Sequence, residues 1–173
     1  MSFLLALMLA VAQPATDWLS PFVGVWDTVD TYYPATGEPI VERATRTCEM
    51  VMRGSYLQCE TVADRPGGRG RTYRFLINYN RTSQRFEMLS LWSNVPHKAV
   101  QSLAPNDVRD RWLIREVAVI GDDEPLAPHY SELVFERSDR IVWTGRRITT
   151  GGDPSSDPSS APLSFVETWT RRR

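Results

Sequence analysis

The chain has 173 residues, of which 42% are hydrophobic and 24% are charged, and its 20 lysines and arginines almost balance its 21 aspartates and glutamates. A net charge of −1 lacks the basic surplus of proteins that grip nucleic acid or anionic membrane surfaces, so no nucleic-acid partner is expected. After the N-terminal residues no run of 18 apolar residues occurs, and no transmembrane segment is expected. These values are typical of one soluble domain.

The first residues have the composition of an export signal. Residues 2–12 (SFLLALMLAVA) are uncharged and apolar, a length that suits the hydrophobic region of a signal peptide and is too short to span a bilayer. Ala10-Val11-Ala12 supplies the small residues of a cleavage site, which predicts a signal peptide over 1–12 and a lead-in over 13–21. An apolar N-terminal helix packed on the domain is the alternative. We expect a periplasmic or secreted protein.

From residue 22 to residue 173 the chain alternates short runs rich in β-branched and aromatic residues with clusters of Gly, Pro, Asn, Asp and Ser, the pattern of an all-β domain. The predicted strands are 24–33, 40–51, 56–63, 71–79, 85–92, 95–104, 111–120, 130–137, 140–149 and 163–171. Residues 17–22 are expected to form a short helical turn before them. Short connections favour antiparallel neighbours, and an up-and-down β-barrel of about eight to ten strands has no exposed edges.

Two cysteines lie symmetrically about a predicted hairpin turn. The midpoint between Cys48 and Cys59 falls between Arg53 and Gly54, so the two side chains face each other across the hairpin. A four-residue loop over 52–55 makes this a non-hydrogen-bonded pair with Cα atoms roughly 4.5 Å apart, within disulfide range. The alternative is two buried free thiols in a reducing cytosol. Together with the signal-like start, the register favours a disulfide in an oxidising compartment.

The first strand opens with a Gly-x-Trp motif, Gly24-Val25-Trp26, which resembles the start of the lipocalin and wider calycin barrels. That resemblance implies that Trp26 closes one end of a barrel and is covered by a basic residue from the last strand. The candidates here are Arg171, Arg172 and Arg173, which follow one another at the C-terminus. Cation–π packing and burial of the aliphatic stem explain the value of such a pair.

More of the chain resembles a bacterial family of exported lipocalin-like proteins of unknown function. The similar segments are the runs at 52–57 (MRGSYL), 75–80 (FLINYN), 85–92 and 167–171 (ETWTR). A related calycin branch that binds haem through a histidine usually continues its motif as Gly-x-Trp-x-Gly-x-Gly. Thr28 and Asp30 stand where those later glycines would be, so we expect no haem and no other cofactor.

The barrel interior is the predicted ligand site, because most aromatic residues fall in the strands and an aromatic-lined cavity suits a small, partly apolar molecule. The candidate ligand-binding residues are Tyr73, Phe75, Phe86, Trp92, Trp143 and Arg146. A side-chain-filled core is the alternative. Strand charges at Arg115, Glu116, Glu132, Arg146 and Glu167 either point inward, where they would orient a ligand, or outward into water; alternation allows both phases.

Catalytic motifs are scarce. The two histidines, His97 and His129, lie beside prolines in loop-like stretches, and we interpret them as exposed loop residues and only weak catalytic candidates. Neither the cysteine spacing nor the acidic run at 122–124 suits a metal site. The preferred hypothesis is therefore a small-molecule binding protein. The alternatives are a barrel enzyme that uses a histidine with Glu132 or Glu167, and an envelope structural or interaction domain.

Overall fold

The computed structural model describes residues 14–64, 71–93, 98–120, 129–147 and 161–173. A short helix α1 (Pro14–Leu19) and a 3-10 turn η1 (Ser20–Phe22) precede ten strands. The strands are β1 (Gly24–Tyr32), β2 (Ile40–Val51), β3 (Tyr56–Asp64), β4 (Arg71–Asn80), β5 (Arg85–Trp92), β6 (Lys98–Pro105), β7 (Arg111–Ile120), β8 (His129–Arg137), β9 (Arg140–Arg147) and β10 (Leu163–Arg171). Residues 95–97 and 148–149, placed in strands from the sequence, lie outside the described residues.

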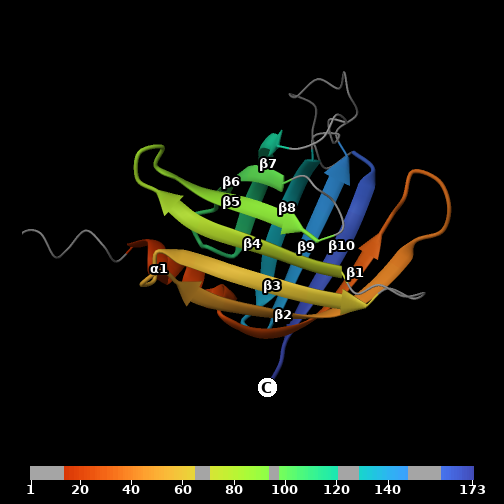
Figure 1. The fold of residues 1–173 in the computed structure, drawn as a ribbon, viewed down its shortest axis with the longest axis horizontal. Coiled ribbons are helices and arrows are strands. Elements are labelled where there is room, and N and C mark those ends of the chain that lie inside the picture. Colours follow the sequence, from red (N-terminus) through yellow and green to blue (C-terminus); the bar gives the residue numbers. More distant parts are fainter. Residues whose placement is uncertain (1–13, 65–70, 94–97, 121–128, 148–160) are drawn as a thin grey trace, which may run out of the picture.

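The ten strands form one closed antiparallel barrel with up-and-down order (Figure 1). Each strand pairs with its neighbours in the chain, and β1 closes the barrel against β10 in a register that places Trp26 opposite Arg171 and Asp30 opposite Glu167. In Figure 1 the strands β2 to β5 run across the front, and β8 to β10 cross behind them at a steep angle. The predicted all-β, lipocalin-like barrel with an N-terminal helical turn is thus confirmed. No helix in the described part of the chain combines the length and apolar character needed to cross a membrane.

The predicted hairpin disulfide is confirmed. Val51 pairs with Tyr56 across the four-residue turn, and Cys48 pairs with Cys59, with Cα atoms 4.1 Å apart and a bond between the two sulfurs. Met52 and Arg53 adopt positive φ angles in this turn, followed by Gly54 at +78°. Both cysteines are buried inside the barrel, so the disulfide links β2 to β3 in the barrel interior.

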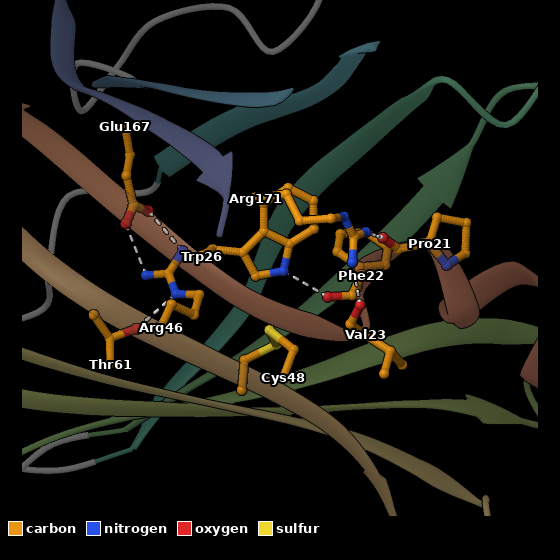
Figure 2. Close-up of a disulfide and its surroundings, with 10 residues drawn as sticks. Pro21, Phe22, Val23, Trp26, Arg46, Cys48, Thr61, Glu167 and Arg171 are labelled. Carbon is orange, nitrogen blue, oxygen red and sulfur yellow. Dashed lines mark hydrogen bonds and ion pairs between the residues drawn. A yellow bond between two sulfur atoms is a disulfide. The ribbon is translucent and has the colours of Figure 1, made fainter. Parts of the chain in front are cut away.

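One end of the barrel is closed by Trp26 and Arg171. The Trp26 indole N–H donates to the carbonyl of Phe22 at 2.8 Å, and the Arg171 guanidinium lies 4.1 Å from the centre of the indole ring (Figure 2). The same guanidinium donates to the carbonyls of Val23 at 2.6 Å and Pro21 at 2.7 Å. Of the three C-terminal arginines, Arg171 therefore takes the place implied by the calycin resemblance.

The glycine of the motif is needed for this closure. Gly24 has φ +139°, and a Cβ atom there would lie 2.5 Å from Nη1 of Arg171. A larger residue would be strained and would displace the guanidinium from Trp26. Gly-x-Trp therefore works together with Arg171, because the bare backbone of Gly24 leaves space for the arginine that covers Trp26.

The half of the barrel next to α1 is packed solid. Trp112 contacts Phe22 and Phe86 with ring centres 5.5 Å and 5.0 Å apart, and Trp169 packs edge-on against Trp26 at 6.0 Å. The remaining void among these rings is about 10 Å³, too small to hold more than about one water. This half is therefore a side-chain-filled core, which was the alternative to a cavity that the sequence left open.

Candidate functional site

The other half of the barrel is hollow. A cavity of about 210 Å³ opens there, and its wall is formed by side chains from β1, β2, β4, β5, β6, β8, β9 and β10. It therefore lies between strands that are distant in sequence. The sequence left open a choice between a cavity and a filled core, and the structure contains both, one at each end of the barrel.

Aromatic rings form much of the wall. The lining includes Tyr73, Phe75, Trp92, Trp143 and Phe165. Tyr73 and Trp92 are register partners on β4 and β5, and Trp143 packs edge-on against Phe165 with ring centres 5.5 Å apart. The Phe165 ring lies directly over Gly145, where a Cβ atom would approach it to 2.1 Å, so the glycine allows this ring to lie flat against β9.

The base of the cavity holds a buried ion pair between Arg46 and Glu167. Nη1 of Arg46 donates to Oε2 of Glu167 at 3.1 Å, Nη2 lies 2.8 Å from Oε1, and Nε donates to the Thr61 hydroxyl at 2.6 Å (Figure 2). The guanidinium also lies 4.1 Å from the centre of the Trp169 ring. Arg46 and Glu167 are 1% and 3% exposed, so their charges depend on each other for compensation.

A second buried pair, Arg71 and Glu42, joins two tyrosines. Nη2 of Arg71 hydrogen bonds to Oε1 of Glu42 and to the Tyr32 hydroxyl, and it donates to the Tyr73 hydroxyl at 2.9 Å. The Tyr73 hydroxyl in turn donates to Oε1 of Glu42 at 2.6 Å. Burial raises the pKa of both phenols, and they remain protonated donors at neutral pH.

Asp30 is a third carboxylate, beside these two pairs. It stands in register between Glu42 on β2 and Glu167 on β10, it lines the cavity, and it is 5% exposed. Tyr32 hydrogen bonds to its carboxylate, but Oδ1 is buried and has no hydrogen-bond partner among the described residues. Burial, followed by the nearby charge of Glu167, raises the pKa of Asp30 to about 7.

The predicted ligand-binding residues are divided by the structure. Tyr73, Phe75, Trp92 and Trp143 line the cavity. Phe86 lies in the packed half against Trp112, and Arg146 is not among the lining residues; its Nη1 donates to the carbonyl of Ala161 at 2.7 Å.

The strand charges also fall into two groups. Glu167 points inward, whereas Glu132 is half-exposed and pairs with Arg111 at 3.0 Å, and Arg115 is exposed. His97 and the side chains of His129 and Glu116 lie outside the described residues, so their candidate roles stay predictions. Among the described residues no group of three or more His, Cys, Asp or Glu is placed to hold a metal ion.

Sequence reasoning missed the polar side chains Asp30, Glu42, Arg46 and Arg71. A signal for them was present, because side chains two residues apart in a strand share a face. A Trp26 side chain that closes one end of the barrel points inward, which places Thr28, Asp30 and Tyr32 on the inner face too. Likewise Cys48 facing inward places Arg46 and Glu42 inside the barrel. Because charged side chains usually face the solvent, we would ordinarily expect them on the outer face of the barrel.

Comparisons with known proteins bear on the fold. No protein-family model matches the chain, and no match was found among curated proteins. Among solved structures, Rv2717c from M. tuberculosis superposes with a TM-score of 0.65 at 12% identity, covering 92% of this chain and 98% of that one. The S-type phycobiliprotein lyase CPES from Guillardia theta gives 0.60 at 10% identity, covering 91% and 92%. At identities this low, the superpositions show that the lipocalin-like barrel fold is shared, and they do not show that an activity is shared.

Proposed function

We propose that this protein binds a small, partly apolar molecule in the hollow half of its barrel. The observation that carries the proposal is the cavity of about 210 Å³ next to a fully packed half. An apolar protein cavity of about 150 Å³ accepts benzene, so this volume suits a molecule with one or two rings. Aromatic walls with a few buried polar groups are the usual composition of such sites.

Binding, rather than catalysis, is the function that the described side chains support. The polar groups that line the cavity are carboxylates, guanidiniums, hydroxyls and an amide. In each of the two inward-facing ion pairs, the arginine and the glutamate already bind each other. The enzyme alternative depends on His97 or His129, whose side chains lie outside the described residues. The envelope-domain alternative has no observation that favours it over the cavity.

A neutral fluorophore tests the binding function. Prodan, a neutral fluorophore built on one naphthalene of two fused rings, is expected to bind saturably with one molecule per chain, and its fluorescence will be excited by energy transfer from Trp92 and Trp143 in the wall. Ser131→Phe places a ring in the cavity and should weaken binding at least about tenfold. Ser102→Phe is the matched control, because Ser102 on β6 lies outside the lining.

Urea unfolding verifies that each variant is folded, and Ser90→Leu provides a second, smaller filling of the same cavity. Wild-type protein that is folded and shows no saturable binding contradicts the proposal. So does equal binding by wild type and both filled variants.

We propose further that the protein is exported. The support is the signal-like stretch over 1–12 together with the Cys48–Cys59 bond, since structural disulfides persist in oxidising compartments. Expressed with its N-terminus intact in a bacterial host, the protein is expected in the periplasm or medium with the mass of residues 13–173 less two hydrogens. Reduction should restore those two hydrogens. Recovery of uncleaved, fully reduced protein from the cytosol would contradict export.

A further inference from the structure

The charges at the base of the cavity do not balance. Glu42, Asp30 and Glu167 form one row across β2, β1 and β10, because Asp30 is the register partner of both glutamates. Two buried guanidiniums face this row, and each is already engaged: Arg46 with Glu167 and Arg71 with Glu42. When all five groups are ionised, no other cation in the described part of the chain pairs with the negative charge of Asp30.

The surplus carboxylate faces the cavity. Asp30 lines the cavity and is 95% buried, and none of the residues that the structure describes donates a hydrogen bond to its Oδ1. Arg74, the remaining arginine in the wall, is 44% exposed and pairs with Glu60 at 2.9 Å. A buried carboxylate oxygen that lacks a donor is costly unless a donor arrives with the ligand.

The surroundings of Asp30 also suit the rest of such a ligand. Tyr73, Trp92, Trp143 and Phe165 present aromatic surface in the same cavity, and its volume suits one or two rings. The faces of aromatic rings attract cations as well as apolar groups. An anionic ligand would instead meet the unpaired carboxylate, so charge complementarity favours a positive end.

We propose that the cavity selects a small organic ammonium ion with an aromatic or apolar body, whose N–H donates to Oδ1 of Asp30. The inference rests on the proposed binding function and adds the chemical class of the ligand. The body of the ligand packs against the aromatic wall, and its ammonium group supplies the positive charge that the row of three carboxylates lacks.

The protonation of Asp30 links binding to pH. The groups that face it are Glu167 on β10, Tyr32 on β1, Arg46 and Glu42 on β2, and Arg71 and Tyr73 on β4. Because the pKa of Asp30 is raised to about 7, an ammonium ligand must displace a proton below that pH. Ammonium affinity is therefore expected to fall about tenfold between pH 8 and pH 6, whereas the affinity of a neutral analogue stays constant.

Calorimetry with three matched probes tests this selectivity. The probes are 2-phenylethylamine, 2-phenylethanol and phenylacetate, which share a ring and differ in the charge of the end group. At pH 8 the amine is expected to bind at least about tenfold more tightly than the alcohol, the ratio of one charge-assisted hydrogen bond, and phenylacetate should bind most weakly. At pH 6 the advantage of the amine over the alcohol should largely disappear.

Two variants of β1 assign the effect to one carboxylate. Asp30→Asn keeps the shape of the side chain and should reduce the amine-to-alcohol affinity ratio from about tenfold to about one. Asp27→Asn is the control: Asp27 lies on the outer face of the same strand, pairs with Arg172 and is 56% exposed. It should keep the wild-type preference.

Each result decides between the two proposals. Equal affinity for amine and alcohol, tighter binding of phenylacetate, or a preference that survives in Asp30→Asn overturns the ammonium site and leaves the binding function intact. Failure of all three probes, with Prodan still bound, likewise overturns the ammonium site alone. Failure of the fluorophore as well overturns both.

Discussion

Replacing Arg46 with methionine is expected to lower the free energy of unfolding by about 3–5 kcal/mol. The substitution removes the only guanidinium that Glu167 contacts among the interactions the structure describes, and it leaves that glutamate buried beside Asp30. The guanidinium that compensates the buried charge of Glu167 is then gone, and an uncompensated buried charge is strongly destabilising. Urea unfolding followed by tryptophan fluorescence at pH 7.5 measures the loss.

The matched control is Arg74→Met on β4. Arg74 also pairs with a glutamate, Glu60, at 2.9 Å, but the two side chains are 44% and 38% exposed. An exposed pair contributes at most about 1 kcal/mol, so this variant should unfold close to wild type. Adding Glu167→Gln to Arg46→Met should recover part of the stability, because the uncompensated charge is removed. A loss for Arg46→Met no larger than that for Arg74→Met would show that the ion pair is not the support the geometry indicates.

Most of the fold was predictable from local sequence patterns. Alternation and turn residues located all ten strands to within a few residues, and the placement of the cysteines about the 52–55 turn set the register of β2 against β3. These features depend on neighbours in the chain, so one sequence contains them. The Gly-x-Trp motif added the closed end, where Gly24, Trp26 and Arg171 meet.

The candidate site was only partly predictable, because alternation tells which residues share a face and not which face is inside. Fixing the phase requires an anchor in each strand. Trp26 provides one for β1 and Cys48 for β2. In β9 the predicted cavity residues Trp143 and Arg146 are three positions apart and therefore lie on opposite faces, and only Trp143 lines the cavity. In β10 a register shift between Leu163 and Phe165 further breaks simple counting. The cavity itself depends on distances between strands that are far apart in sequence.

The two halves of the barrel make opposite contributions to the stability of the fold. Near α1, large rings fill the interior, and their burial favours folding. In the hollow half, five ionisable groups are held out of water and the space between the walls is left open, both of which oppose folding. The disulfide and the closed end supply stability that this second half does not. Sites that cost stability in this way are where function is expected.

Asp30→Asn is expected to stabilise the ligand-free protein above neutral pH. The folded-state pKa of Asp30, about 7, lies above its ordinary value of 3.8, so the folded protein keeps this proton at pH values where the unfolded chain has lost it. The contribution of Asp30 to stability is therefore highest below about pH 4 and falls as the pH rises from 4 to 7. The shift of about three pH units bounds the loss at roughly 4 kcal/mol.

Because asparagine does not titrate, the variant lacks this loss, although its buried amide still needs partners. We therefore expect it to exceed wild type by about 1–3 kcal/mol at pH 8 and to match it near pH 4. Urea unfolding of both proteins across pH 4–8 gives the difference curve, with Asp27→Asn on the exposed face of β1 expected to run parallel to wild type. A difference between wild type and Asp30→Asn that stays constant from pH 4 to pH 8 would show that Asp30 titrates as an ordinary carboxyl group. In that case the row of Glu42, Asp30 and Glu167 would not destabilise the folded protein. An ammonium ligand would then gain no affinity from compensating the negative charge of this row.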